Sequence, residues 1–263
     1  MRAADYPCLR GFAAIVHRGG AAYGPNLGRE NTMHAFGQAV ALGFDYLETD
    51  LHTTADGTLV AFHDADLCRV TGQPGRIADY SAAQVAEFRV GGIDPIPTFE
   101  EIVAGFPGVR LNLDIKDDRA VEPLVRSIRR HGIAARVCVG SFGPRRLWRF
   151  RRLMGTSVAT AAGRLGVAWA TLAARPMRLV RTPAPAFQVP LDVPRPGGGR
   201  IRVLTPRLIA AAHAAERVVH AWTVDDAETM NRLIDEGVDG IVTDRIDVLK
   251  DVLTARGMWE GTR

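Results

Sequence analysis

Strand and helix signals alternate along the whole of this chain, and no other feature of the sequence restricts the fold as strongly. Short apolar runs of strand length are followed by longer segments with apolar residues at helical spacing. Strands that are joined through helices run parallel in one sheet. The strand-length runs in this series are Phe12–His17, Phe44–Asp50, Val109–Lys116, Arg136–Ser141, Thr156–Thr160, Pro185–Val189, Arg217–Val224 and Gly237–Thr243.

The series amounts to eight strand–helix units once the extended run Thr58–His63 and two short helices after it, Asp79–Phe88 and Thr98–Ala104, are set aside. Eight units predict an α/β fold whose parallel strands close into a (β/α)8 TIM barrel. An open doubly wound sheet is disfavoured, because the first turn is HRGG and lacks the pattern G-x-G-x-x-G. The longer helices are expected at Thr32–Leu42, Ala120–His131, Pro144–Met154, Arg164–Ala174, Thr205–Ala215, Asp226–Glu236 and Ile246–Ala255.

The composition is that of a soluble globular protein, with 47% hydrophobic and 24% charged residues. The net charge of +4 suits an anionic ligand but is too small to indicate nucleic-acid binding. Cys8, Cys68 and Cys138 have no metal-like spacing, which favours buried free thiols in a reducing compartment. No signal peptide is visible, so we expect a cytoplasmic protein. The Pro- and Gly-rich stretch Arg181–Arg200 predicts a surface loop rather than a linker, so residues 1–263 should form one domain.

Ionisable side chains collect where the predicted strands end. The first strand ends at His17 and Arg18, and the second ends with Glu48 and Asp50; Thr58–His63 ends at a further histidine. In TIM barrels the active site lies at the carboxyl ends of the strands. These polar residues should therefore meet at one rim of the barrel.

Carboxylates from two neighbouring strands should converge at this rim. Glu48 and Asp50 are two residues apart on a strand and point to the same face, as do Asp114 and Lys116. Unpaired carboxylates would repel one another, and a hard divalent cation such as Mg²⁺ or Ca²⁺ would resolve this. Arg18 and Lys116 would complete a clamp for a phosphate group.

His17 and His63 could then supply a general base and a general acid. Together with the metal and the clamp, they indicate metal-assisted displacement at phosphorus. Each piece has a simpler reading: a lone histidine is more often structural, and a Glu-x-Asp pair is more often solvated. The convergence of all these groups at the same strand ends favours the functional interpretation.

Six stretches of the chain match motifs of a known family, and together they span nearly its whole length. The longest, ETDLHTTADGTLVAFHDADLCRVTG (Glu48–Gly72), follows the family pattern almost throughout. The chain resembles the glycerophosphodiester phosphodiesterases. The other matching stretches are VHRGG (Val16–Gly20), ENT (Glu30–Thr32), LNLDIK (Leu111–Lys116), AWTVDD (Ala221–Asp226) and GVDGIVTD (Gly237–Asp244).

This resemblance implies a TIM barrel with a small insertion after the second strand, here roughly residues 51–106. It implies that His17 and His63 are the catalytic histidines. Trp222, the aromatic residue on the seventh strand, would line the pocket near the alcohol moiety. The usual Asn after the Thr-Val of that strand is Asp225 here, which adds negative charge near the mouth.

The resemblance also implies metal ligands and phosphate contacts. The metal carboxylates fall on Glu48, Asp50 and Asp114, and the phosphate contacts on Arg18 and Lys116. The third-strand acid is commonly Glu in this family, whereas this chain has Asp114. The shorter side chain predicts ligation through water or a changed metal preference.

The sequence thus predicts metal-dependent hydrolysis of a small glycerophosphodiester to glycerol 3-phosphate and an alcohol. One alternative is a lysophospholipase D that acts on membrane-derived lysophospholipids with the same site. The basic, aromatic stretch PRRLWRFRRLMG (Pro144–Gly155) keeps a weak peripheral membrane contact open, although an outer barrel helix with a solvated basic face is the favoured explanation. A non-catalytic phosphate- or lipid-binding barrel is disfavoured, because no histidine or carboxylate of the set is missing. The sequence does not indicate the oligomeric state.

Overall fold

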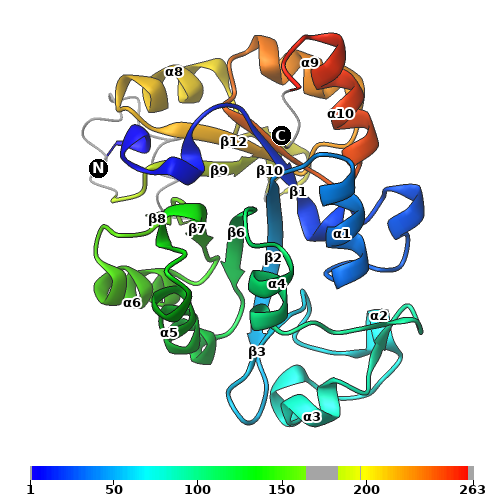
Figure 1. Ribbon diagram of the computed structural model, residues 1–263. Coiled ribbons are helices and arrows are strands. Elements are labelled where there is room, and N and C mark those ends of the chain that lie inside the picture. The colour runs from blue at the N-terminus through cyan, green and yellow to red at the C-terminus, as the bar shows by residue number, and fades with distance from the viewer. Residues whose placement is uncertain (1, 164–182, 196, 260–263) are drawn as a thin grey trace.

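Eight parallel strands form the centre of the molecule (Figure 1). The computed structural model describes residues 2–163, 183–195 and 197–259. The order of the strands around the sheet is β8-β7-β6-β2-β1-β13-β12-β9, and a parallel bridge between Ala161 and Ala186 joins the two ends of the sheet. The predicted (β/α)8 TIM barrel is confirmed. The strands are β1 (Ala13–Val16), β2 (Tyr46–Thr53), β6 (Arg110–Ile115), β7 (Val137–Gly140), β8 (Ala159–Thr160), β9 (Ala186–Pro190), β12 (Val218–Trp222) and β13 (Gly240–Thr243).

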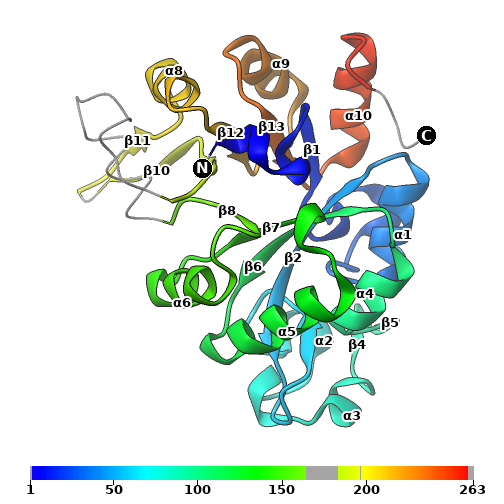
Figure 2. The same cartoon turned by 60° about the vertical axis from the view of Figure 1, so that its left-hand side comes forward.

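Helices cover the outside of these strands (Figure 2). Their starts follow local capping chemistry: the side chains of Thr32, Thr205 and Asp226 each accept a hydrogen bond from a backbone N–H of the first turn. The helix predicted at Arg164–Ala174 lies outside the described residues. The others lie within a few residues of their predicted positions: α1 (Met33–Ala41), α5 (Val121–His131), α6 (Pro144–Met154), α8 (Pro206–Ala214), α9 (Ala227–Asp235) and α10 (Ile246–Ala255).

The chain between β2 and β6 forms a small unit beside the barrel. Its first strand pairs antiparallel with β2 and leads back to the rim. The helix predicted at Asp79–Phe88 is shorter than expected, because Tyr80 is extended and Ser81 caps a new single turn. The elements are β3 (Leu59–Ala61), α2 (Cys68–Thr71), α3 (Ala82–Val85), β4 (Arg89–Val90), β5 (Asp94–Pro95) and α4 (Phe99–Gly105). A separate apolar cluster holds them: Val60, Phe62, Leu67, Ile77, Val85, Val90 and Ile96.

Two further expectations need correction. The stretch Arg181–Arg200, predicted as a loop around one short strand, also contributes to an antiparallel hairpin, β10 (Asp192–Pro194) with β11 (Arg200–Arg202). Gly197–Gly199, all with positive φ, make its turn. Of the cysteines, Cys68 is exposed rather than buried.

The amino-terminal segment packs against the strands. Cys8 lies in an apolar cluster with Cys138, Ala159 and Ala186, and both cysteines in this cluster are buried free thiols, as expected. Within the part of the chain that the structure describes, no helix has the length and apolar character needed to cross a bilayer.

Candidate active site

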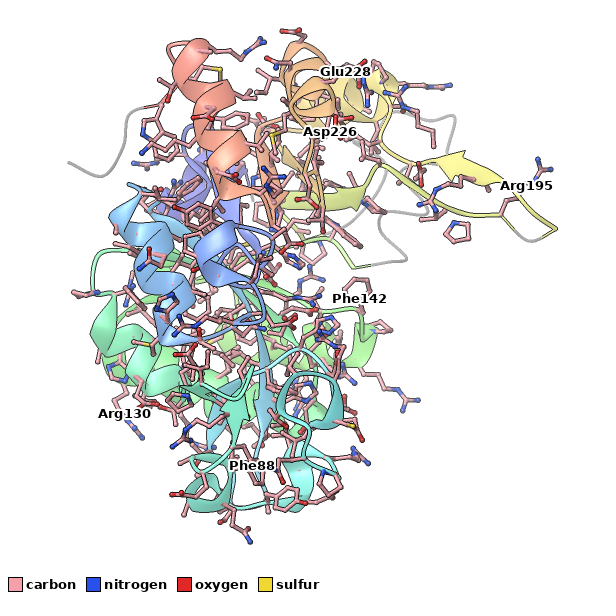
Figure 3. The ribbon with its side chains drawn as sticks, turned by 90° about the vertical axis from the view of Figure 1, so that its right-hand side faces the viewer. Phe88, Arg130, Phe142, Arg195, Asp226 and Glu228 are labelled. Carbon is pink, nitrogen blue, oxygen red and sulfur yellow. The ribbon has the colours of Figure 1, made fainter. Side chains whose placement is uncertain are left out.

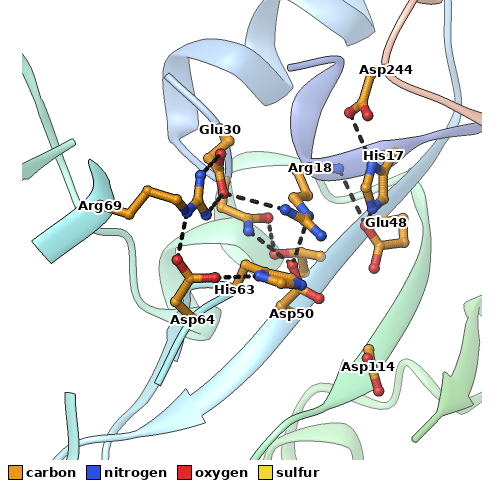
Figure 4. A network of polar contacts seen from close by, with 12 residues as sticks. His17, Arg18, Glu30, Glu48, Asp50, His63, Asp64, Arg69, Asp114 and Asp244 are labelled. Atoms are coloured by element: carbon orange, nitrogen blue, oxygen red, sulfur yellow. Dashed lines mark hydrogen bonds and ion pairs between the residues drawn. The ribbon is translucent and has the colours of Figure 1, made fainter. Parts of the chain in front are cut away.

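Most of the predicted site residues lie together at the carboxyl end of the barrel strands, around β2. Figure 4 shows His17, Arg18, Glu48, Asp50, His63 and Asp114 in this region. Glu48 and Asp50 lie within β2 and are almost fully buried, with 6% and 2% of their surfaces exposed. Asp50 lies opposite Asp114 in the register of β2 with β6. Three carboxylates from two neighbouring strands therefore occupy the same region, as the sequence pattern predicts.

Two cations neutralise part of this charge. Lys116 Nζ lies 2.9 Å from Asp50 Oδ1 and 2.7 Å from Asp114 Oδ2, and Arg18 Nε lies 3.3 Å from Asp50 Oδ2. Burial disfavours the charged form of Asp50, but these cations outweigh it and lower the pKa of Asp50 below its ordinary value. Asp50 is therefore a stable anion at neutral pH.

Glu48 is compensated less well than Asp50. Burial, together with the charge of Asp50, raises its pKa from 4.5 to about 8. The backbone N–H of Arg18 donates a hydrogen bond of 3.2 Å to Glu48 Oε2. Burial also raises the pKa of Asp114 above its ordinary value, although Lys116 opposes this. The side chains at this rim thus provide less positive charge than its buried carboxylates require.

His17 follows β1 directly. Its Nδ1 donates to Asp244 Oδ1 at 2.9 Å, and its Nε2 lies 3.9 Å from Glu48 Oε2. Burial disfavours the charged ring, but the hydrogen bond to Asp244 and the charge of Glu48 raise the pKa of His17 above 6.5. Asp244 fixes the ring so that Nε2 is turned towards the buried carboxylates.

His63 approaches from β3 and has a similar partner. Its Nδ1 donates to Asp64 Oδ1 at 2.6 Å. Arg69 Nε donates to the other oxygen of Asp64 at 2.5 Å, and the two terminal nitrogens of Arg69 bind both oxygens of Glu30 at 2.8 and 2.7 Å. Glu30 Oε1 in turn lies 3.5 Å from Arg18 Nη1. One chain of ionic contacts thus connects His63 to the site arginine.

Asn31 supports β2 from the loop between β1 and α1. Its side-chain amide donates to Asp50 Oδ2 at 3.1 Å and accepts from Thr49 Oγ1 at 2.8 Å. It is buried and has a φ of 56°, which is unusual for a residue other than glycine. Gly19 in the same loop lets α1 pack closely against it, because a Cβ at this position would lie 2.5 Å from the Cβ of Ala35.

Aromatic side chains flank the charged centre. Trp222, at the end of β12, packs edge-on against Phe142 with ring centroids 5.8 Å apart. Lys116 Nζ lies 5.4 Å from the centre of the Phe142 ring. Phe142 is 49% exposed and lies at the surface of the molecule (Figure 3). The pair forms an apolar wall beside the cationic group of Lys116.

The carboxylates fit a hard divalent cation in their chemistry. All donors are oxygens, and Asp114 Oδ1 is buried without a hydrogen-bond partner in the structure. As they stand, no three His, Cys, Asp or Glu side chains among the described residues are grouped closely enough to hold a metal ion. Asp50 and Asp114 share the positive charge of Lys116 Nζ.

The residues that hold the predicted ones in place have no role in the sequence-based prediction. The motif ENT, the pair His-Asp after β3 and the acid after β13 all carried a signal, because polar residues at strand ends face the rim. Arg69 carried no such signal, since it lies in a short helix outside the barrel. The supporting residues are Glu30, Asn31, Asp64, Arg69 and Asp244.

Comparison with known proteins decides the family. Residues 17–248 match the model of the glycerophosphoryl diester phosphodiesterase family, and this range includes every predicted site residue. The chain belongs to this family. Membership assigns it to the phosphoric diester hydrolases, in agreement with the resemblance seen in its sequence.

Individual relatives agree with this assignment. A probable glycerophosphodiester phosphodiesterase 2 from Mycobacterium tuberculosis is 41% identical over 256 residues, which cover 95% of this chain and 94% of the relative. A phosphodiesterase from Oleispira antarctica, solved in complex with the product sn-glycerol-3-phosphate, has the same fold with a TM-score of 0.76 at 20% identity, covering 92% of this chain and 97% of that one. A human lysophospholipase D is 39% identical, over only 39% of this chain and 35% of its own length.

Replacing Glu48 with Gln should remove a pH-dependent loss of stability. A carboxyl group whose folded-state pKa is raised contributes stability below its unfolded pKa and loses it as the pH rises to the folded value, here about 8. The free energy of unfolding of the metal-free wild type should therefore fall, relative to that of E48Q, between about pH 5 and about pH 8.5. Urea unfolding in EDTA measures this difference.

The exposed substitution Glu87→Gln is the control, and its stability should follow that of the wild type across this range. If the free energies of unfolding of the wild type and E48Q changed with pH in parallel, Glu48 would not lie in a site that lacks positive charge.

Proposed function

We propose that this chain hydrolyses glycerophosphodiesters to glycerol 3-phosphate and an alcohol, with His17 and His63 as the proton-transfer pair. The observation that carries the proposal is that the two histidine rings make matching contacts. Each donates its Nδ1–H to an aspartate, Asp244 or Asp64, and so leaves Nε2 as the free nitrogen. Histidines held in this way suit general acid–base catalysis, in which one ring accepts the proton of the nucleophile and the other protonates the leaving alcohol.

The cations of the rim are suited to bind the phosphodiester group. Arg18 and Lys116 offer N–H donors beside the carboxylates, and such donors hold the charged oxygens of a phosphate. Glu48, Asp50 and Asp114 would hold a divalent metal, Mg²⁺ or Ca²⁺. When bound, that metal supplies positive charge that stabilises the extra negative charge on the phosphoryl oxygens.

The apolar wall of Phe142 and Trp222 suits the carbon side of a glycerol or alcohol group. It lies next to Lys116, so a phosphate held there would place its ester groups against the two rings. This arrangement of charge on one side and apolar surface on the other fits a small polar diester better than a nucleic acid, whose recognition needs an extended basic surface.

Replacing either His17 or His63 with Ala should lower kcat by about 10²–10⁴ without unfolding the protein, because each ring transfers a proton. The measurement is the rate of glycerol 3-phosphate release from glycerophosphocholine, alongside thermal unfolding. His213→Ala is a matched control: His213 also pairs with an aspartate, Asp239, at 2.8 Å, but lies in α8, away from the rim. Near wild-type turnover in H17A or H63A would refute the assigned role.

Chelation tests the proposed metal. Product release from glycerophosphocholine, glycerophosphoethanolamine and glycerophosphoinositol should stop in EDTA, because the buried carboxylates then lack the charge that the reaction needs. Adding back Mg²⁺ or Ca²⁺ in excess should restore it. Activity that persists after complete chelation would contradict a metal role for Glu48, Asp50 and Asp114.

Hydrolysis of lysophospholipids at a membrane is the second candidate function. Helix α6 buries Leu147 and Phe150 but leaves Trp148 62% exposed, with the Arg152 guanidinium 5.1 Å from its ring. An exposed aromatic ring beside arginines suits the interface of an anionic bilayer. The wild type should then co-sediment with phosphatidylglycerol vesicles at low salt, and W148A should bind less. Absence of the wild type from the vesicle pellet would leave α6 as an ordinary outer helix.

A further inference from the structure

Arg69 makes an unusual set of contacts for a side chain that is 48% exposed. All three guanidinium nitrogens donate to carboxylates: Nε to Asp64, and Nη1 and Nη2 to the two oxygens of Glu30. Glu30 belongs to the loop after β1, whereas Asp64 and Arg69 follow β3. Arg69 therefore connects the two segments that carry His17 and His63 (Figure 4).

We propose that Arg69 is a positioning residue for the phosphodiesterase reaction: by binding Asp64 and Glu30 together, it fixes the ring of His63 and the guanidinium of Arg18. The inference rests on the proposed function for its effect on turnover, but its effect on the His63 ring does not depend on activity.

The first arm of Arg69 acts through Asp64. The carboxylate of Asp64 is a neighbour of His63 in sequence, and its side chain would be free to rotate if only the histidine held it. Arg69 binds Oδ2 at 2.5 Å and leaves Oδ1 to accept from His63 Nδ1 at 2.6 Å. Burial raises the pKa of Asp64, but the hydrogen bonds from Arg69 and His63 outweigh this and lower it to about 2. Asp64 thus stays ionised and keeps the proton of the neutral His63 ring on Nδ1.

The second arm acts through Glu30. Its Oε1 accepts from Arg69 Nη2 at 2.7 Å and lies 3.5 Å from Arg18 Nη1. Arg18 also lies against Asp50, so its head group is held from two sides. Loss of the Arg69 contact would leave Glu30 free to move and Arg18 less well placed for a phosphate.

Arginine is required for both arms at once. A planar guanidinium presents several donors in fixed directions and binds one carboxylate through two parallel hydrogen bonds while Nε serves another. The ammonium of lysine is a compact charge on a flexible stem and cannot reproduce this fork. A positive charge at position 69 should therefore not be sufficient to hold both Asp64 and Glu30 in place.

The test compares R69A and R69K with the wild type. We expect each to lower kcat roughly 10- to 100-fold, as loss of a residue that orients an active-site group does, with a smaller rise in KM from the Arg18 arm. In the D64N background, R69A should lower kcat by less than about threefold, because residues in one network are not additive. Guanidinium ion at low concentration should partly restore R69A, since the vacated position is open to solvent, whereas ammonium should not.

If Arg69 only stabilised the fold, these variants would behave differently. Arg202→Ala is the control: Arg202 is 50% exposed, and its Nη2 lies 2.8 Å from Oε1 of Glu236, which is 18% exposed. R202A should keep wild-type kcat. Turnover of R69A or R69K within twofold of the wild type, or an R69A effect that is as large in D64N as in the wild type, would overturn the proposal.

A second readout is independent of turnover. Spectra of protein with ¹⁵N-labelled histidine, with the His63 signals assigned by H63A, report which ring nitrogen carries the proton in the neutral ring. The Nδ1–H form should dominate in the wild type and lose population in R69A. An unchanged His63 tautomer in R69A would refute the positioning role even in an active enzyme. An inactive wild type with the expected tautomer change would instead refute the proposed function alone.

Discussion

The burial of two carboxylates within β2 is the constraint on which the rest of the rim depends. Glu48 and Asp50 are two residues apart on one strand and almost excluded from solvent. Ionised carboxylates in such a place are costly unless other groups compensate them. The neighbouring polar groups provide that compensation: Lys116 comes from the end of β6, and Arg18 and Asn31 come from the loop after β1.

The loop after β1 accepts backbone strain to reach these carboxylates. Arg18 and Asn31 both have positive φ, of 49° and 56°, although neither is glycine. Such conformations cost free energy and persist where the surrounding contacts enforce them. Here the backbone N–H of Arg18 binds Glu48, the amide of Asn31 binds Asp50, and Asn31 N–H binds the carbonyl of Arg18. The two residues with strained backbone thus both donate hydrogen bonds to the buried carboxylates.

Much of the fold and the central part of the site could be predicted from the sequence, because both follow from periodicity. Alternating apolar runs give the barrel, and strand ends place His17, Glu48 and Asp114 at one rim. Contacts between loops could not be predicted in this way. The clamp of Arg69 on Glu30 depends on how β3 returns beside β2, which is a tertiary arrangement without a local pattern. The hairpin β10–β11 was missed because Pro and Gly mark a turn without specifying the strands on either side.

Isotope incorporation tests most directly whether the rim is a centre for displacement at phosphorus. Glycerophosphocholine should be hydrolysed by the wild type in H₂¹⁸O and the products analysed by mass spectrometry and ³¹P NMR. We expect ¹⁸O to enter the phosphate of glycerol 3-phosphate and the released choline to carry none. Isotope in the released choline would contradict displacement at phosphorus, and release of choline phosphate with free glycerol would contradict glycerol 3-phosphate as the product.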